Sequence, residues 1–498
     1  MKGERLEMKK LLSDFEFGFA DAEKEYSRIP DIFDSSFYDG KDIVHRLVNK
    51  HQFLLVGRKG VGKSAVNARI RYLSNITERM FSFSLQLNDF EYTTFAKTSI
   101  DKDSLGTQKY KESWEFILLI TCIKILYNKM GMSEISELKK TADFLEKIGF
   151  AIKKDLNYKK NITWLSKIKL GNSIASIDLE FDKELGVKPS TYLERISLLN
   201  DLMRETIYQL SFNENNLFIV IDGVDDILRF KKNQLNMLAS LIRSVDYLNE
   251  KFYAENVPIK IILCIREDIL ASITDPDLNK IKRDSSLLID WTSNKSGLRE
   301  VVKLRFEYSG ILKREASSYW YEIFPKKIRR KDSWEYVLDY TLLKPRDILQ
   351  FLKTCQDLFP NVQTIGYGEV NEAIKNYSKD YFIEEMKNEV TGFVNDELIT
   401  LLPTIFQRIG SNRFTLNDLY RHYKQQGGQN QDEDEIKHLL ILLYEAGYVG
   451  QLIPTQVKNG GQRKSVIFKY RNPSSQVDLM QTFIVHQGIQ AGLGVRIH

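Results

Sequence analysis

The chain has 498 residues, a length that predicts two or three domains rather than a single core. Hydrophobic residues make up 43% and charged residues 28%, which is the composition of a soluble globular protein. The formal net charge is only +5, so charge alone does not indicate nucleic-acid binding. Three scattered cysteines argue against a disulfide framework, and the charged N-terminus lacks the apolar core of a signal peptide. We therefore expect a cytoplasmic protein with no membrane partner.

The first predicted elements surround a phosphate-binding motif. We expect a helical lead-in over residues 1–50, with a helix over residues 42–48 before a buried strand at residues 53–56. Residues 57–64 read Gly-Arg-Lys-Gly-Val-Gly-Lys-Ser, the pattern G-x-x-x-x-G-K-[ST], and a helix continues over residues 65–70. A chance match is uncommon, and the flanking strand and helix make it rarer. We interpret the segment as a nucleotide-binding loop.

The residue types in this loop explain its chemistry. Its glycines let backbone N–H groups close around a polyphosphate at the positive end of a helix. Lys63 is expected to reach the β- and γ-phosphates, and the Ser64 hydroxyl to ligate Mg²⁺. The residues expected to contact the nucleotide are Gly57, Arg58, Lys59, Gly60, Val61, Gly62, Lys63, Ser64 and Ala65.

Strands and helices then alternate, which predicts a mostly parallel sheet covered on both faces. The most apolar stretch, residues 114–122, lies in a predicted helix over residues 108–128 and is too short to span a bilayer, so we expect it to be buried. Residues 130–190 interrupt the alternation and are interpreted as an insertion of unassigned role. The other predicted elements are strands at residues 80–87, 217–221, 259–264 and 287–289 and helices at residues 192–210 and 233–250.

The strand at residues 217–221 ends in Asp222, and an apolar strand that ends in Asp is the Walker B arrangement. We expect its carboxylate at the carboxyl edge of the sheet, where it would hold Mg²⁺ directly or through water. The alternative is that Asp222 only caps the next helix. A further carboxylate must orient or activate the attacking water. Asp225 and Asp226 are both candidates, and the sequence does not separate them.

Two arginines are candidate phosphate sensors. Arg266 follows the strand at residues 259–264 and could sense the γ-phosphate, unless it pairs with a neighbouring carboxylate on the surface. Arg346 follows Pro345 at the start of a predicted helix, where it could couple a helical lid to the nucleotide, unless it is an ordinary surface arginine. The base is expected to be adenine, because residues 294–297 lack the aspartate of a guanine-binding motif.

The last part of the chain predicts two further modules. From about residue 308 to 385 the pattern is entirely helical, and residues 308–388 are expected to form a helical lid. Residues 389–498 predict a winged helix, because three short helices precede strand-like segments at residues 449–453 and 465–470. One of these helices is expected to begin with a capping box at Thr415-x-x-Asp418.

Whether this winged helix contacts DNA stays open. Its expected recognition helix, residues 432–446, begins with four acidic residues that would repel phosphates, which favours a structural or protein-binding module. The alternative is a DNA contact through a basic wing. The basic run at residues 326–331 is interpreted as a solvated surface, with nucleic-acid binding as the alternative. The basic residues of the wing are Lys458, Arg463, Lys464, Lys469 and Arg471.

With these motifs in this order, the chain resembles the STAND/NACHT and KAP-like branches of the additional-strand P-loop ATPases. It is also similar to origin-recognition initiator ATPases, which share a helical lid and a terminal winged helix. Residues 222–226 read Asp-Gly-Val-Asp-Asp, closest to the NACHT pattern D-G-x-D-E, with Asp226 in place of Glu. An AAA+ enzyme would have Glu directly after the first Asp, where this chain has Gly223, and this argues against AAA+ motor activity.

Three further segments, residues 17–19, 57–60 and 468–472, are similar to a bacterial family of P-loop ATPases whose relatives often occur in bacteriophage-defence systems. The resemblance implies an α/β fold of the P-loop NTPase type with a parallel sheet, a helical lid and a C-terminal winged helix. The expected domains are the lead-in at residues 1–50, the ATPase domain at 51–307, the lid at 308–388 and the winged helix at 389–498.

The function expected from these features is an ATP-binding and hydrolysing switch with Mg²⁺ as cofactor, held by Ser64 and Asp222. The catalytic residues would be Lys63, Asp222, Asp225 or Asp226, and Arg266. Self-association and a separate effector protein are the expected partners, because no other catalytic signature is visible. Two alternatives stay open: a DNA-bound initiator or loader ATPase that uses the winged helix, and a non-hydrolysing scaffold stabilised by ATP.

Overall fold

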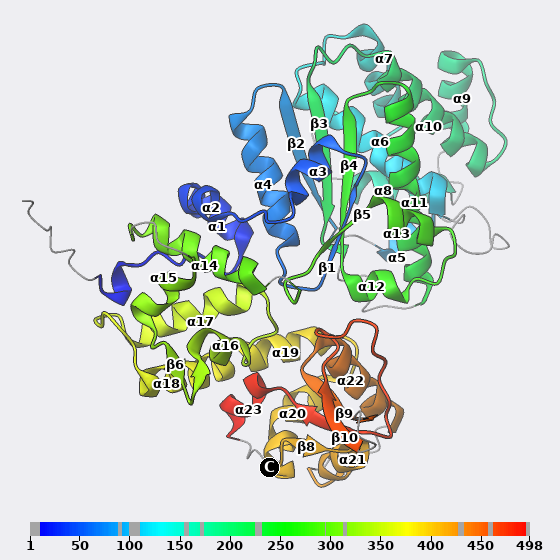
Figure 1. Ribbon diagram of the computed structural model, residues 1–498. Coiled ribbons are helices and arrows are strands. Elements are labelled where there is room, and N and C mark those ends of the chain that lie inside the picture. The colour runs from blue at the N-terminus through cyan, green and yellow to red at the C-terminus, as the bar shows by residue number, and fades with distance from the viewer. Residues whose placement is uncertain are drawn as a thin grey trace, which may run out of the picture. The chain divides into compact units, whose positions relative to one another are not determined.

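The computed structural model forms two compact units (Figure 1). The sheet unit comprises Lys41–Lys59 and Lys63–Ile289, and the C-terminal unit comprises Met1–Gly40, Gly60–Gly62 and Asp290–His498. The domain boundaries expected from the sequence stay predictions. The residues that the structure describes are 10–87, 92–98, 110–153, 159–169, 174–224, 232–293, 295–311, 316–426, 433–456 and 462–494.

The sheet unit is built on five parallel strands, in the order β2-β3-β4-β1-β5 (Figure 1). The strand β4 therefore lies between β1, which precedes the loop, and β3, which ends in Asp222. This confirms the parallel sheet of the additional-strand type. Nearly every residue of β3 and β4 is buried, as expected for strands covered on both faces. The strands are β1 (Leu54–Gly57), β2 (Met80–Gln86), β3 (Asn216–Asp222), β4 (Ile259–Ile265) and β5 (Ser286–Ile289).

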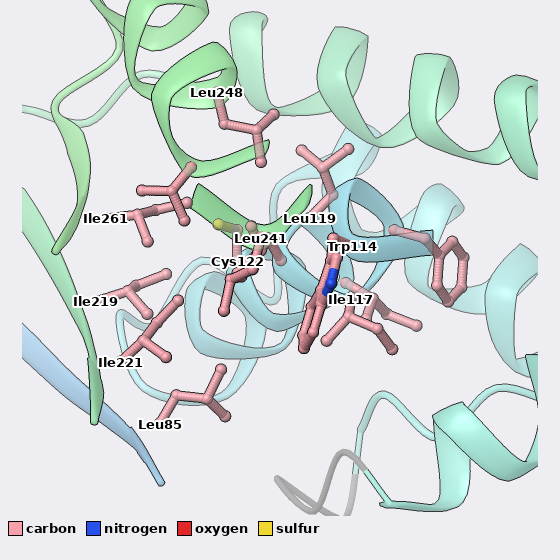
Figure 2. Close-up of a cluster of buried hydrophobic side chains, with 14 of the residues drawn as sticks. Leu85, Trp114, Ile117, Leu119, Cys122, Ile219, Ile221, Leu241, Leu248 and Ile261 are labelled. Atoms are coloured by element: carbon pink, nitrogen blue, oxygen red, sulfur yellow. The ribbon is translucent and has the colours of Figure 1, made fainter. Parts of the chain in front are cut away.

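The core of the sheet unit forms around the helix α6 (Lys111–Asn128), which is buried as predicted. Trp114 and Ile117 of α6 are fully buried and belong to the same cluster as Ile219 of β3 and Ile261 of β4 (Figure 2). The Trp114 indole N–H donates to the Met237 carbonyl at 2.9 Å, so its polar atom is satisfied. No helix in the described part of the chain is both long and apolar enough to cross a membrane.

The other helices of the sheet unit complete its layers. The helix α4 packs against β1, β2 and β3, and α11 packs against β4 and α6. In the described part of the expected insertion at residues 130–190, the apolar side chains of α7, α8 and α9 join the same core. The helices are α3 (Ile43–Asn49), α4 (Lys63–Ile76), α5 (Tyr92–Ala96), α7 (Ser136–Lys147), α8 (Lys159–Lys169), α9 (Ile174–Leu185), α10 (Tyr192–Tyr208), α11 (Lys232–Ala254), α12 (Glu267–Ser272) and α13 (Leu278–Ser285).

The C-terminal unit includes the start of the chain. Glu25 is buried and accepts hydrogen bonds from the Arg305 guanidinium at 2.8 Å and from the Phe19 backbone N–H at 2.7 Å. Gly18 has a φ of +71°, and a Cβ there would lie 2.1 Å from the Glu25 carboxylate, so only glycine fits. The N-terminal elements are η1 (Leu12–Asp14), α1 (Ala22–Arg28) and α2 (Pro30–Ser36).

The described residues of the expected lid region are not helical throughout, because they include a hairpin. The strands β6 (Lys327–Ile328) and β7 (Lys331–Asp332) pair antiparallel, so the prediction of helix throughout was wrong at this point. Asp332, the last residue of β7, then caps α16 by accepting hydrogen bonds from the N–H groups of Trp334 and Glu335. The helical elements are α14 (Lys295–Tyr308), α15 (Ala316–Ile323), α16 (Ser333–Leu338), α17 (Pro345–Leu358), α18 (Tyr367–Tyr377), the π-helical turn η4 (Ser378–Phe382) and α19 (Ile383–Val390).

The end of the chain is a winged helix, as predicted. Its four strands form a sheet in the order β10-β9-β11-β8, and the Thr415–Asp418 capping box is present at the start of α21. The elements are α20 (Asp396–Ile409), β8 (Arg413–Phe414), α21 (Leu416–Lys424), α22 (Glu433–Ala446), β9 (Val449–Gln456), β10 (Gln462–Ile467), β11 (Thr482–Val485) and α23 (Gln487–Leu493).

Candidate nucleotide site

The loop after β1 encloses the side chain of Lys63, the first residue of α4. The Lys63 ammonium is buried and donates to the carbonyl oxygens of Gly57 at 3.0 Å and Arg58 at 3.3 Å. Gly60 and Gly62 have φ angles of +79° and +109°, a region that favours glycine. The loop therefore turns back on itself and places its lysine at the N-terminal end of a helix, where backbone N–H groups attract anions.

Ser64 and Asp222 meet at the carboxyl edge of the sheet. The Ser64 hydroxyl donates to Asp222 Oδ2 at 3.0 Å, and Asp222 Oδ1 accepts from the Gly223 backbone N–H at 2.8 Å. Asp222 is the last residue of β3 and is only 8% exposed. The sequence motifs that are about 160 residues apart therefore converge on one point. The sheet unit has the fold of a P-loop NTPase.

The donor set of this P-loop site fits a nucleotide-bound magnesium ion. A hydroxyl and a carboxylate are hard oxygen ligands, and Mg²⁺ is commonly held by one or two such groups together with phosphates and waters. Among the described residues, no cluster of three or more His, Cys, Asp or Glu side chains could hold a metal by itself. Ser64 and Asp222 would thus hold a metal that arrives with a phosphate ligand, rather than a resident one.

Arg266 follows β4 and is tied to a neighbouring carboxylate. Its guanidinium forms two hydrogen bonds to Asp268, at 3.0 and 2.6 Å. Burial alone would raise the pKa of Asp268, but the charge and hydrogen bonds of Arg266, the Ile269 N–H and the charge of Lys63 outweigh it and hold that pKa below its ordinary value. The positive charges of both Arg266 and Lys63 thus stabilise the ionised form of Asp268.

Three loop residues, Gly60–Gly62, belong to the C-terminal unit. Within that unit the Val61 carbonyl accepts a hydrogen bond from the Trp291 indole at 2.8 Å. A Cβ on Gly60 would lie 3.4 Å from Cδ of Lys344 and 3.7 Å from Cδ of Arg346. The tip of the loop is therefore packed against the turn that starts α17.

This turn has an unusual backbone. Leu343 is buried with a φ of +55°, a conformation that costs a non-glycine residue roughly 1–3 kcal/mol. The turn is held by Thr341, whose hydroxyl accepts from the Leu343 N–H at 3.2 Å, and by Asp347, which accepts from the Leu342 N–H at 2.8 Å. The strained turn presents Lys344 to the tip of the loop.

The remaining predicted site residues are placed as follows. Arg346 is the second residue of α17, directly after Pro345, and its guanidinium lies 3.9 Å from the Glu385 carboxylate. Arg58, Lys59 and Ala65 are partly exposed, and Val61 is buried. Asp225 and Asp226 lie outside the described residues, as does Lys458 of the wing.

Sequence reasoning missed Asp268 and Lys344. The signal for Asp268 was a carboxylate two residues after the strand-end arginine, a spacing that lets the guanidinium donate two hydrogen bonds to the carboxylate. The signal for Lys344 was a lysine directly before the Pro345-Arg346 pair, at the N-cap of a helix. Trp291 was also missed, because its bond to the loop joins residues 230 positions apart.

Comparisons with known proteins give one family match. Residues 296–384 match the family described as the FunZ-associated C-terminal helical domain, which here covers α14 to the start of α19. No curated protein sequence matches this chain. The resemblance to the STAND/NACHT and KAP-like branches stays a prediction.

The solved structures that are similar to this chain include two that it covers almost completely. One is the Aeropyrum pernix Orc1 protein in complex with DNA, with 11% identity, a TM-score of 0.42 and coverage of 94% of this chain and 95% of that one. The other is Cdc6p from Pyrobaculum aerophilum, with 11% identity, a TM-score of 0.29 and coverage of 96% and 98%.

Proposed function

We propose that this chain binds ATP with Mg²⁺ and hydrolyses it, and that the nucleotide state changes its assembly and its partner contacts. The observation that carries the proposal is the 3.0 Å hydrogen bond between Ser64 and Asp222 beside the buried ammonium of Lys63. These three groups are the minimum that a P-loop needs to hold a triphosphate and its metal.

Each residue has a definite task in this proposal. Bound ATP and Mg²⁺ would supply the γ-phosphoryl group and the charge that polarises it. Lys63 would exchange its carbonyl partners for phosphate oxygens, while Ser64 and Asp222 would hold the metal. Arg266 would sense the γ-phosphate. Asp225 or Asp226 would orient the attacking water.

The switch itself is supported by the loop tip. Gly60–Gly62 is packed with Trp291 and the Lys344–Arg346 turn, so a change of the loop around a phosphate must be accommodated by that packing. Packed elements commonly respond to such local shifts by moving between discrete arrangements. We propose that such a rearrangement couples ATP hydrolysis to self-association and to the binding of a separate effector protein.

Nucleotide binding and phosphate release by purified variants test the proposal. We expect Lys63→Ala to weaken ATP binding by at least roughly tenfold, and Asp222→Asn to keep ATP while losing roughly a hundredfold or more in hydrolysis rate. Lys280→Ala, which changes an exposed lysine of the same unit, is the matched control and should leave both unchanged. Wild-type affinity in Lys63→Ala would contradict the proposal. ATP retained by the wild type without phosphate release would favour the scaffold alternative.

The assembly part needs a separate measurement. The mass of wild type and Asp222→Asn in solution, with ATP and with ADP, should differ between the nucleotides if ATP drives self-association. A mass that is the same in all four samples would remove assembly from the proposal. The bacteriophage-defence setting comes from the sequence resemblance alone, and it predicts that cells carrying the wild type, but not Lys63→Ala, plate phage with reduced efficiency.

The initiator-type alternative has less support in the described part of the winged helix. The helix α22 begins with Glu433, Asp434 and Glu435, which would repel phosphates. Of the basic wing residues, Lys469 pairs with Glu445 at 3.4 Å and Arg471 lies 3.9 Å from Asp339. Lys464 is exposed, and the side chain of Arg463 lies outside the described residues. A structural or protein-binding winged helix is the better proposal.

A further inference from the structure

The hairpin of β6 and β7 carries a dense group of exposed cations. Five of its six consecutive residues from 326 to 331 are Lys or Arg, and all five are exposed, whereas Ile328 is 1% exposed and anchors the hairpin in the core. Lys326, Lys327 and Arg330 form no ion pair with a described residue. Their charge is therefore not neutralised by the part of the chain that the structure describes.

The turn of this hairpin has the conformation least suited to arginine. Ile328 pairs with Lys331, so the loop has two residues, Arg329 and Arg330, with φ angles of +49° and +66°. Positive φ at both positions is the type I′ turn, which strongly prefers Asn-Gly. Two arginines there are strained, and strained residues that persist in a fold point to a function for their side chains.

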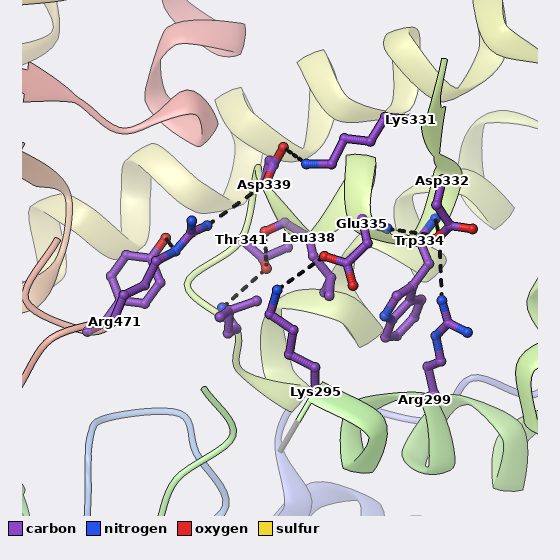
Figure 3. Close-up of polar contacts among 12 residues, drawn as sticks. Lys295, Arg299, Lys331, Asp332, Trp334, Glu335, Leu338, Asp339, Thr341 and Arg471 are labelled. Carbon is purple, nitrogen blue, oxygen red and sulfur yellow. Dashed lines mark hydrogen bonds and ion pairs between the residues drawn. The ribbon is translucent and has the colours of Figure 1, made fainter. Parts of the chain in front are cut away.

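The acidic residues beside the hairpin are engaged elsewhere (Figure 3). Asp332 caps α16 and lies 3.4 Å from Arg299, and Glu335 pairs with Lys295 at 3.1 Å. The carboxylate that approaches the hairpin cations is Asp339, which pairs with Lys331. The acidic side chains that the structure describes around the hairpin thus leave most of its charge uncompensated.

Asp339 also joins the hairpin to the winged helix. Its Oδ1 lies 3.9 Å from the Arg471 guanidinium, while its Oδ2 pairs with Lys331 (Figure 3). Two basic segments that are 140 residues apart in the chain therefore meet over one carboxylate. We call the hairpin cations the basic face, which consists of Lys326, Lys327, Arg329, Arg330 and Lys331, and Arg471 borders this face beside Asp339.

We propose that the basic face binds the phosphate backbone of duplex DNA, with the hairpin as a ribbon at a groove. A two-stranded ribbon fits the major groove of B-form DNA, whereas the major groove of A-form RNA is too narrow. Single strands are held by successive stacked aromatic rings, whereas beside the hairpin the 44% exposed ring of Tyr367 already contacts Arg329, whose Nε donates to the Tyr367 hydroxyl at 2.6 Å. A membrane site would need an apolar anchor, and Ile328 is buried.

Fluorescence anisotropy of the full-length protein with a labelled duplex tests the proposal, using about 30 base pairs of mixed sequence at about 50 to 200 mM KCl. The charge variant is Lys326→Gln with Lys327→Gln. We expect affinity to fall at least tenfold, and the slope of log affinity against log salt to become shallower by about 0.9 for each lost phosphate contact. The matched control, Lys375→Gln with Lys379→Gln, changes two exposed lysines of the same unit and should bind as the wild type does.

A variant of the hairpin turn shows whether DNA affinity falls because contacts with DNA are lost or because the hairpin no longer folds. Arg329→Asn with Arg330→Gly installs the preferred turn sequence, so its melting temperature should equal or exceed that of the wild type while DNA affinity falls. The proposal is overturned if both hairpin variants keep wild-type affinity and salt slope. It is also overturned if duplex RNA, polyglutamate or anionic vesicles bind the wild type and DNA does not. All samples are measured without added nucleotide, so a failure here is distinct from a failure of the ATPase proposal.

Discussion

Asp268 is the carboxylate that pairs with Arg266, the arginine that we propose senses the γ-phosphate. Its two hydrogen bonds fix the plane of the guanidinium, and its pKa is held below the ordinary value partly by the charge of Lys63. Arg266 and Lys63 therefore share one counter-charge. A γ-phosphate would compete with Asp268 for both cations, which makes Asp268 a positioning residue for the proposed reaction.

The variant Asp268→Asn should show whether Asp268 orients Arg266 for hydrolysis or contributes to ATP binding. Because the amide keeps the shape but loses the charge, we expect the single-turnover hydrolysis rate to fall roughly tenfold while the dissociation constant for ATP changes little. Rapid-quench measurement with excess enzyme, alongside equilibrium ATP binding, gives the two quantities. If Arg266–Asp268 is only a surface pair, neither will change, and Asp268→Glu will be indistinguishable from Asp268→Asn.

At the scale of elements, local sequence patterns predicted individual strands and helices, whereas contacts between segments were harder to predict. Apolar runs predicted β1, β3 and β4, the proline at the first position predicted the start of α17, and a Thr-x-x-Asp spacing predicted the cap of α21. The P-loop and Asp222 could be placed because strands of a parallel sheet end at one edge. The hairpin of β6 and β7 was missed because its ladder is two residues long and its turn lacks Gly and Asn. Lys344 was missed because its neighbour, Gly60, is remote in the chain.

His486 gives the winged helix a pH dependence. Burial, assisted by the charge of Arg471, lowers the pKa of His486 to about 3, and its Nδ1 accepts from the Gly488 N–H at 3.0 Å as the cap of α23. The unfolded chain takes up a proton near pH 6.5, whereas the folded one does not. The stability contributed by neutral His486 is therefore complete above that pH and is lost as pH falls toward 3, by up to about 1.4 kcal/mol per pH unit.

The variant His486→Asn tests this dependence. Asparagine can cap the helix through its side-chain oxygen but does not titrate, so the fall in unfolding free energy between about pH 6.5 and pH 4.5 should become shallower by roughly one proton. Urea unfolding of both proteins across this range, followed by tryptophan fluorescence, gives the slopes. Parallel slopes would show that His486 is not the group responsible.

For the molecule as a whole, the start of the chain is part of the same unit as its end. The buried pair of Glu25 and Arg305 joins residues 280 positions apart, with side-chain exposures of 2% and 7%. The sequence offered no local signal for this pair, since neither residue lies in a motif. Residues 10–40, expected only as a lead-in, thereby carry part of the packing of the unit that contains the winged helix.

Removing one partner of this pair should destabilise the C-terminal unit strongly. Glu25→Ala leaves the Arg305 guanidinium buried without its counter-charge, which typically costs about 3–5 kcal/mol. The double variant Glu25→Leu with Arg305→Met replaces both charges by apolar groups and should recover most of that loss. Urea denaturation of the full chain measures both. Equal losses in the single and double variants would show that the pair does not stabilise the unit through its charges.

The sequence of the tripeptide Gly60–Gly62 is constrained in two ways. It lies in the middle of the phosphate-binding motif, and it is also packed with Trp291 and the start of α17. Recombination between relatives would have to respect this. In a chimaera that takes residues 290–498 from another parent, the tripeptide would pack against side chains that did not evolve with it. Trp291, Lys344 and residues 60–62 should therefore be exchanged together. Crossovers that separate them should be selected against.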